Sequence, residues 1–331
     1  MYQPQAYGVV LLFMLISMVC WGSWANTMKL TRHWPFPLFY WDYVIGVLAT
    51  SLVLAFTAGS GHGGRSSFLS NLLQGDARHF VYAIAGGAVF NVANLLLVAA
   101  IEIAGLAVAF PVGIGLALII GVLLNYVVAP RGNPLLLFGG VALIAMAIVF
   151  DALAYRAREV NRRDVSRKGI FVSLGSGVLM GVFYPLVARA ITGEHALGPY
   201  TVGVIFALGV LLCAIPLNYF FMRKPITGGQ PLRLKEYADG RASYHWFGIL
   251  GGSIWCLGSV LNFVASHAQL VGPAVSYAIG QGATMVSAIW GVFIWREFAD
   301  SPVQARRFLP YMFVCFVVGL GAVAIAPIIS F

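Results

Sequence analysis

Residues 80–128 read FVYAIAGGAVFNVANLLLVAAIEIAGLAVAFPVGIGLALIIGVLLNYVV, and their apolar pattern is typical of a membrane protein. The segment contains two apolar runs, residues 80–101 and 105–128, separated by a short turn that begins at Glu102. A helix that crosses a bilayer needs about 20 apolar residues, because each residue rises about 1.5 Å and backbone polar groups must be satisfied within the helix. The segment therefore predicts two membrane-spanning helices joined by a tight turn.

The same pattern continues over the whole chain of 331 residues. The composition is 60% hydrophobic and 9% charged with a mean hydropathy of +0.88, whereas soluble domains contain about a quarter charged residues. Ten runs are long enough to span a bilayer: residues 8–28, 38–57, 80–101, 105–128, 134–154, 169–190, 200–221, 245–267, 271–294 and 308–328. The sequence predicts an all-α membrane protein with ten transmembrane helices.

The second half of the chain resembles the first. Short turns at Glu102–Gly105 and Gln269–Gly272 follow the third and the eighth run. Around them, Gly86, Gly87, Gly105, Ala107, Val108, Phe110, Gly113 and Gly115 align with Gly251, Gly252, Gly272, Ala274, Val275, Tyr277, Gly280 and Gly282. Because each half holds an odd number of spans, the halves must be inverted in the membrane. We expect two inverted five-helix repeats, residues 1–155 and 169–331, joined by a basic central loop at residues 156–168.

Basic residues indicate the orientation of the chain. Of the 20 Lys and Arg residues, 16 fall in connections on the face that holds the central loop. Short loops rich in Lys and Arg stay cytoplasmic, which predicts a multi-pass protein of the plasma (inner) membrane with both termini extracytoplasmic. The net charge of +9 is thus assigned to topology signals in a lipid bilayer and not to nucleic acid. No Lys or Arg precedes the first run, so we expect a permanent span and not a cleaved signal peptide.

Polar residues inside the runs are candidates for a solute path. Asn91 and Asn94 share one helix face, and further polar stripes lie on the eighth run (Trp255, Ser259 and Asn262) and the ninth (Tyr277, Gln281 and Thr284). Such groups either hydrogen-bond neighbouring helices or contact a solute, and both interpretations remain open. Stripes at one depth in related runs favour a neutral, amide-rich cavity, in which Trp21, Trp24 and Trp255 can stack on flat solutes. A strongly anionic substrate would need a buried Arg or Lys, and we expect none there.

Three carboxylates lie in or against apolar runs: Asp42, Glu102 and Asp151. We expect Glu102 and Asp151 to be solvated at helix ends. Asp42 lies about one turn inside the second run, where partial desolvation would let it act as the proton-coupling residue. The alternative is a structural ion pair with Lys29 or Arg32.

The sequence contains no motif that is typical of an enzyme active site. The six histidines form no HExxH motif or close pair, and the four cysteines lie in apolar runs without metal-ligand spacing. We therefore expect no catalytic residues, no metal site and no cofactor. Inverted halves without acidic rings favour a carrier over a channel, and no pattern points to an oligomeric state.

Short motifs carry a resemblance to a known family. They are CWGSWAN (Cys20–Asn26), MKLT (Met28–Thr31), FYWDY (Phe39–Tyr43), AGGAVFNVANL (Ala85–Leu95), LLNY (Leu123–Tyr126) and WGVFIWREF (Trp290–Phe298). With them the chain resembles the ureide permease family of the drug/metabolite transporter superfamily over nearly its whole length. Plant members are known for a longer central loop; here the loop is short and lacks a GxxxxGK[ST] pattern, so the resemblance does not imply nucleotide regulation.

The resemblance implies proton-coupled transport of a small neutral solute, a ureide such as allantoin or a nucleobase-like heterocycle. A glucose, ribose or rhamnose porter of the same superfamily is the alternative. The expected substrate-binding residues are Trp21, Trp24, Asn26, Asn91, Asn94, Trp255, Ser259, Asn262, Tyr277 and Gln281. Asp42 is the expected proton-coupling residue.

Overall fold

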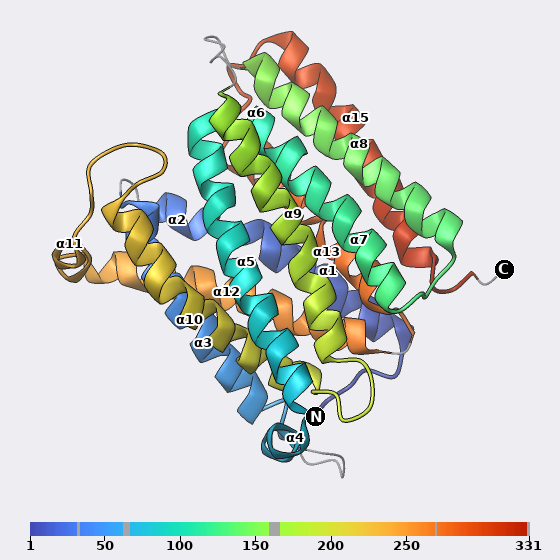
Figure 1. Ribbon diagram of the computed structural model, residues 1–331. Coiled ribbons are helices and arrows are strands. Elements are labelled where there is room, and N and C mark those ends of the chain that lie inside the picture. The colour runs from blue at the N-terminus through green and yellow to red at the C-terminus, as the bar shows by residue number, and fades with distance from the viewer. Residues whose placement is uncertain (32–33, 62–66, 159–165, 269, 330–331) are drawn as a thin grey trace.

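The computed structural model describes residues 1–31, 34–61, 67–158, 166–268 and 270–329, and within them it contains helices and no strand (Figure 1). Within these residues ten helical passes are long and apolar enough to cross a membrane, which confirms the predicted all-α membrane protein with ten transmembrane helices. In chain order they are α1 with α2 (Tyr7–Ser23, Asn26–Leu30), α3 (Phe36–Phe56), α5 (Ala77–Ala104), α6 with η1 and α7 (Leu106–Ala109, Phe110–Gly115, Leu116–Val128), α8 (Pro134–Arg158), α9 (Arg167–Ala190), α10 (Pro199–Arg223), α12 (Ala242–His267), α13 with α14 and η2 (Pro273–Gly280, Ala283–Ile289, Trp290–Ile294) and α15 (Val303–Ile325). Short helices α4 (Phe68–Gln74) and α11 (Leu234–Ala238) lie in connections.

Prolines and glycines set the helix boundaries. Pro199 and Pro273 each occupy the first position of a helix, where the missing backbone N–H is not needed. Gly105 and Gly272 have φ angles of 77° and 80°, which a residue with a side chain rarely adopts, and each stands directly before or at the start of the next pass. The last pass begins at Val303, whereas the apolar run was predicted to begin at residue 308. The prediction began late because exposed Arg306 and Arg307 interrupt the apolar pattern in the first turns of this helix.

Three of the passes are interrupted along their length. The first pass breaks between α1 and α2 at Trp24–Ala25, and the ninth breaks between α13 and α14 at Gln281–Gly282. The fourth contains the π-helical turn η1, which includes Pro111. Interrupted or π-helical turns expose backbone groups and are frequent at functional sites.

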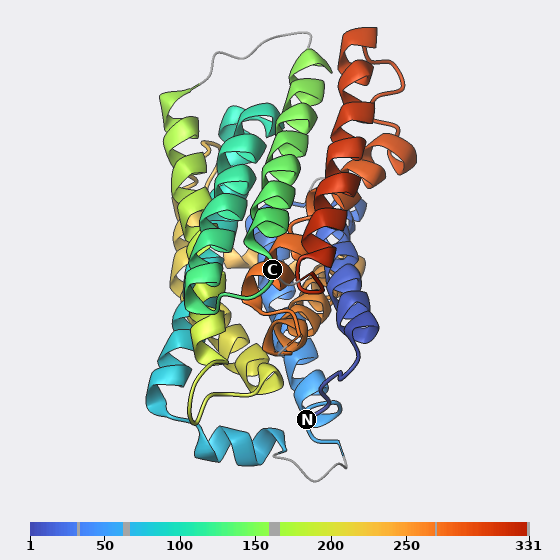
Figure 2. The same ribbon diagram turned by 90° about the vertical axis from the view of Figure 1, so that its right-hand side faces the viewer.

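The packing of the two halves follows the same scheme. Helix α5 packs against α9 and α10, and α12 packs against α1 and α3. Helices α8 and α15 pack on each other at the periphery (Figures 1 and 2). The Tyr7 hydroxyl donates to the Ala324 carbonyl, so α1 begins where α15 ends. In Figure 2 the N-terminus and α4 lie at the bottom, opposite the end of α8 and the start of α9.

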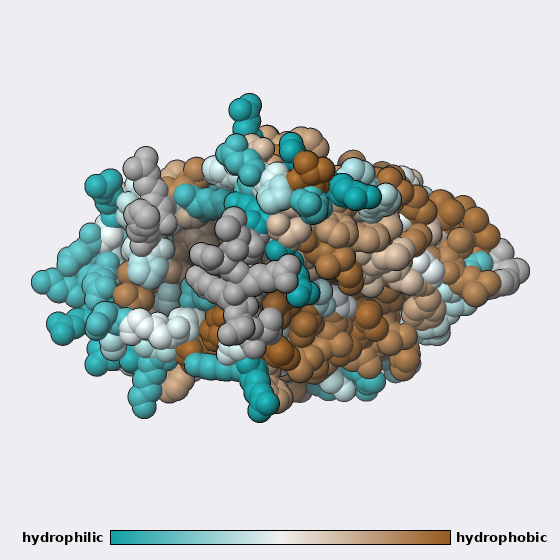
Figure 3. Space-filling view, turned by 90° about the horizontal axis from the view of Figure 1, so that it is seen from above, coloured by the Kyte–Doolittle hydropathy of each residue, from teal (hydrophilic) through white to brown (hydrophobic). Residues whose placement is uncertain are grey.

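The outer surface separates by polarity. Seen from above, hydrophilic residues gather on the side where α2 and α11 lie, and hydrophobic residues cover the side toward which α8 and α15 run (Figure 3). Large apolar side chains such as Val53, Val127 and Leu135 are exposed on the outer helices. This surface is suited to contact lipid tails.

Glycine permits the closest helix contacts, and one of them supports a prediction. A Cβ on Gly252 would lie 1.9 Å from the Tyr43 carbonyl oxygen, and one on its counterpart Gly87 would lie 2.1 Å from that of Phe206. Because neither backbone carbonyl can move away without a large energetic cost, we expect Gly252→Ala to destabilise the fold by about 1 to 3 kcal/mol or more. The yield of monodisperse protein in size-exclusion chromatography measures this. The control is Gly139→Ala, where the added Cβ meets nothing within 4 Å; equal yields for both variants would contradict the prediction.

Candidate functional site

A cavity of about 610 Å³ lies between the interrupted passes and helices α3, α5, α9 and α12. Its deep part contains Phe90, Asn94, Trp255 and Gln281, and it extends to the helix ends that bear Lys29, Trp34 and Glu102. The complete lining is Trp21, Trp24, Ala25, Met28, Lys29, Trp34, Pro35, Phe36, Phe90, Asn94, Leu97, Val98, Ile101, Glu102, Ile114, Met180, Phe183, Trp255, Gly280, Gln281, Ala283, Thr284 and Ser287. The end of α2, the start of α3 and the end of α5 lie on the face predicted to be cytoplasmic, so the cavity reaches toward that face.

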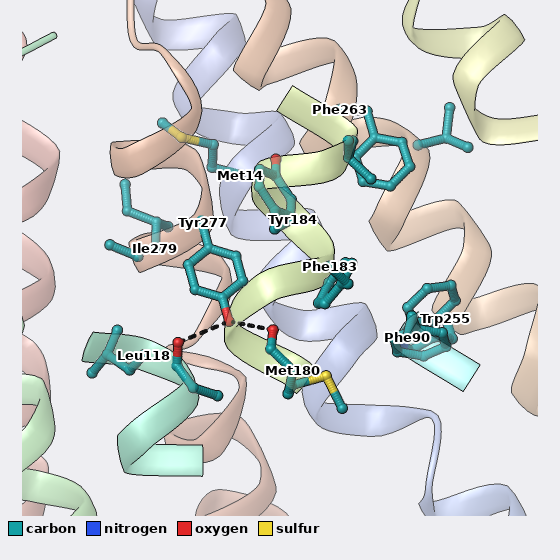
Figure 4. Packing of buried hydrophobic residues seen from close by; sticks show 14 of the residues in the cluster. Met14, Phe90, Leu118, Met180, Phe183, Tyr184, Trp255, Phe263, Tyr277 and Ile279 are labelled. Carbon is teal, nitrogen blue, oxygen red and sulfur yellow. Dashed lines mark hydrogen bonds between the residues drawn. The ribbon is translucent and has the colours of Figure 1, made fainter. Parts of the chain in front are cut away.

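Aromatic rings form the inner wall of this cavity. The rings of Phe90 and Trp255 stack with centroids 4.2 Å apart and planes at 25° (Figure 4). Trp21 lies nearly parallel to Trp255, at 6.3 Å and 16°. Its indole N–H donates to Ser259 Oγ at 2.9 Å, so Trp21 presents its ring and not its donor to the cavity. Flat aromatic faces of this kind favour planar or ring-shaped solutes.

Amides and hydroxyls provide the polar part of the inner lining. Asn94 is 4% exposed, and its Nδ2 has no hydrogen-bond partner. Gln281 lies at the break between α13 and α14, and its side-chain amide makes no hydrogen bond within the described residues. The Thr284 hydroxyl donates to the Gln281 carbonyl at 2.9 Å. Buried donors without a partner are costly, so Asn94 is equipped to bind an acceptor that enters the cavity.

Of the ten expected substrate-binding residues, five line the cavity. The other five lie outside the lining and form hydrogen bonds to neighbouring helices. Asn91 accepts from the Tyr40 hydroxyl at 2.9 Å. Tyr277 donates to carbonyls of Ala117 and Met180, each at 3.2 Å (Figure 4). Asn262 bonds Ser17, Tyr184 and Ser276, Asn26 accepts from Trp295, and Ser259 bonds Trp21 and Trp255.

Several lining residues were not among those expected from sequence. Phe90, Met180 and Phe183 are ordinary apolar residues within apolar runs, and such residues carry no signal by themselves. The alignment of Gly87 with Gly252 makes Phe90 the counterpart of Trp255 in the other half. This equivalence was the sequence signal that could have identified Phe90 as a lining residue. Lys29 also lines the cavity, at its mouth, where its side chain is exposed and paired with Glu297.

Asp42 lies in a hydrogen-bonded cluster at the start of α3. It is 2% exposed, its Oδ2 lies 2.8 Å from His245 Nδ1, and its Oδ1 accepts from the Tyr237 hydroxyl at 2.7 Å. Burial raises the pKa of Tyr237, and the hydrogen bond to Asp42 and its charge raise it further, so this phenol stays a donor. Trp34 contacts both His245 and Tyr237, with ring centroids 5.0 and 6.2 Å apart, and also lines the cavity. The cluster is thereby in contact with the cavity mouth.

Of the two expected alternative partners of Asp42, Lys29 binds another residue. Lys29 pairs with Glu297 at 2.7 Å, because α2 lies beside the segment after η2, while α12 presents His245 to α3. Arg32 lies outside the described residues. Glu102 is exposed at the end of α5, as expected. Asp151 is buried at 5% exposure and not solvated, because α8 continues two turns beyond it.

Comparison with known proteins shows what this arrangement is similar to. A family model described as ureide permease matches residues 39–169 and 168–326. Ureide permease 1 of Arabidopsis thaliana is 23% identical over 97% of this chain and 97% of its own length. Glucose uptake protein GlcU of Bacillus subtilis (strain 168) is 25% identical over 76% of this chain and 77% of its own. One solved crystal structure, 15% identical, has the same fold with a TM-score of 0.62 over 93% of this chain and 95% of that one.

Proposed function

The chain belongs to the ureide permease family, whose members are transporters and not enzymes, and from this premise we propose that it carries a small neutral ureide or nucleobase-like heterocycle through the central cavity. The observation that supports this most directly is the combination of flat aromatic walls with the unpartnered Nδ2 donor of Asn94. Ureides and nucleobases are planar, or contain planar amide groups, and present carbonyl acceptors to such a donor. The charged side chains of the lining, Lys29 and Glu102, lie at the mouth and not at its inner wall.

A sugar is the second candidate solute. It is supported by the similarity to a glucose uptake protein over 76% of this chain. Sugars also stack on indole rings, but their ring of hydroxyls requires many polar partners. The inner wall offers Asn94, Gln281, Thr284 and Ser287 among many apolar groups, which favours a heterocycle.

Alternating access between two inverted repeats is the mechanism that we propose for this carrier. Two features support it: the packing of α5 on α10 has a counterpart in the packing of α12 on α3, and the closest approaches at Gly87 and Gly252 correspond. Because the cavity reaches toward the predicted cytoplasmic face, we propose that the carrier is inward-facing in this conformation. We place the protein in the plasma (inner) membrane.

Proton coupling through Asp42 is part of the proposal. The support is geometric: a carboxyl at 2% exposure, bonded to a histidine, lies next to cavity-lining Trp34. An imidazole can both donate and accept a proton, so the pair is suited to exchange protons with the cytoplasm. An imposed pH gradient across proteoliposomes is therefore the expected driving force.

Counterflow in proteoliposomes tests the proposed function. Vesicles loaded with unlabelled allantoin should transiently accumulate external labelled allantoin or uracil, and the label should be recovered chemically unchanged. Loading with glucose should produce no such exchange. Exchange of glucose alone would establish the sugar alternative, and equilibration without accelerated exchange would indicate a channel.

The basic connections predict where fused reporters will lie. A reporter after Phe331 should be active outside the cytoplasm, and one inserted at residues 156–168 should be active inside it, because 16 of 20 basic residues share that face. An insertion at Gly228, in the connection between α10 and α12, is a second cytoplasmic position. The opposite result at all three positions would reverse the orientation.

A further inference from the structure

A buried histidine, His79, lies near the start of α5, at the end of the molecule predicted to be extracytoplasmic. This is the end at which α4 lies in Figure 2. The side chain is 2% exposed. Its Nδ1 lies 3.0 Å from the Arg189 carbonyl oxygen, and its Nε2 lies 3.2 Å from the Glu194 carbonyl oxygen. Both nitrogens of the ring therefore face hydrogen-bond acceptors.

These two partners determine which protonation state of the His79 ring fits the site. A backbone carbonyl only accepts hydrogen bonds, and a neutral imidazole has one N–H donor and one lone pair. A neutral ring would therefore direct its lone pair at one of the two carbonyl oxygens and leave that buried acceptor unpaired. The imidazolium, with an N–H on each nitrogen, donates to both.

The carbonyls belong to the end of α9 and to the connection between α9 and α10. Two other elements hold the same connection in place. His267 at the end of α12 has its Nδ1 3.3 Å from the Ile191 carbonyl oxygen, and Asn71 of α4 accepts from the Gly198 N–H at 2.7 Å. Each of these contacts needs only a neutral side chain. The contact of His79 differs because it ties two carbonyls to α5 at once.

Neighbouring charged side chains do not bind the His79 ring within the described residues. The titratable and charged groups on the elements around it are Met1 with its terminal amine, Asp76, Arg78, Tyr82, Arg189, Glu194, His195, Tyr200 and His267. The carboxylate of Asp76 lies 3.8 Å from Arg78, and the Arg189 guanidinium lies over the Tyr82 ring at 6.0 Å. The last carbonyls of α9 carry partial negative charge and favour a cation, whereas the first turn of α5 acts in the opposite direction. The two direct hydrogen bonds are thus the main support for a charged ring.

We propose that His79 is a proton-binding site of the extracytoplasmic face and that the bound proton holds the α9–α10 connection against α5. With the proton, the ring donates to both carbonyls; without it, one of the two hydrogen bonds is lost. The proton comes from external water and returns to it when this end of the molecule opens. Proton uptake from outside thereby favours the state in which the outer end is closed. The inference adds an external proton site to the proposed carrier, in which Asp42 lies near the cytoplasmic cavity mouth.

The charge of the ring is tested by NMR of the purified protein labelled with nitrogen-15 in histidine, without solute. One imidazole should carry hydrogen on both nitrogens and keep both after transfer to deuterated water, because His79 is buried. His79→Gln should remove this signal. His267→Gln is the matched control and should leave it in place. If His79→Gln fails to fold, the unsubstituted protein decides: a spectrum without a slowly exchanging imidazolium would overturn the proposal.

Hydrogen–deuterium exchange tests whether the proton holds the connection. The Leu197 N–H donates to the Ala190 carbonyl at 3.0 Å, so its exchange reports opening of the connection. After correction for intrinsic exchange, its rate should rise about tenfold as the pH is raised and His79 loses its proton, because a hydrogen bond from a charged donor is lost. The rise should persist in His267→Gln, whereas His79→Gln should exchange fast at every pH.

Two results of the exchange experiment would overturn the role of the bound proton. One is an exchange rate that does not change with pH in the unsubstituted protein, and the other is an equal rise in His79→Gln. Neither experiment uses a solute. A protein that carries no ureide can still contain the imidazolium and show the pH-dependent exchange, so failure of the proposed function is a separate result.

Discussion

Asp42→Asn is expected to abolish accumulation driven by a pH gradient and to leave exchange at equal solute concentrations intact. Asparagine fills the same space and can still bond Tyr237 and His245, but it cannot release or bind a proton. For a carrier that moves one proton per solute, each unit of pH gradient sustains about a tenfold solute gradient. The measurement is the ratio of internal to external labelled solute in proteoliposomes, which should fall to about 1 in the variant.

Two further variants separate coupling from structure in this experiment. Asp76→Asn changes an exposed carboxylate before α5, at a distance from the cavity lining, and should accumulate solute like the unsubstituted protein. His245→Gln keeps a hydrogen-bonding side chain next to Asp42 and should shift the pH dependence of uptake. Normal concentrative uptake by Asp42→Asn would refute the coupling role. Loss of both uptake and exchange together with poor folding would identify a structural pair.

Asn94→Ala is expected to weaken solute binding by about 1 to 3 kcal/mol, or about 5- to 150-fold, because a solute carbonyl would lose its buried donor. Gln281→Ala should have an effect of the same kind. Both side chains line the cavity, and the Asn94 Nδ2 donor makes no hydrogen bond within the described residues. The apparent affinity from equilibrium exchange, corrected for the amount of folded protein, measures the change.

Asn91→Ala is the matched comparison for Asn94. The two asparagines are one helical turn apart on α5, but Asn91 bonds Tyr40 and does not line the cavity. Its loss should reduce the yield of folded protein and leave the affinity of that protein unchanged. If the affinity falls in Asn91→Ala but not in Asn94→Ala or Gln281→Ala, the proposed contact of Asn94 and Gln281 with the solute would be wrong, and both side chains would serve helix packing alone.

The carboxylates show how far local sequence can be interpreted. Asp42 was identified because a charge inside an apolar run is costly wherever the helix lies, and the structure does bury it. Asp151 was expected to be solvated, because the predicted run ended at residue 154, whereas α8 continues to Arg158 and α15 packs on it. The charges beyond the run, Arg156 and Arg158, belong to the same helix and not to a loop.

The sequence by itself determined the ten membrane passes and the family, because the apolar length of a helix and the short motifs are local properties of the chain. Only the tertiary structure decided which polar residues face the cavity. The rotation of α5 puts Asn94 into the cavity and Asn91 against α3, and this rotation is set by its contacts with α9 and α10. The pairs Asp42 with His245 and Lys29 with Glu297 join residues more than 200 positions apart. No local pattern encodes such pairs, because they depend on which helices become neighbours when the two halves pack together.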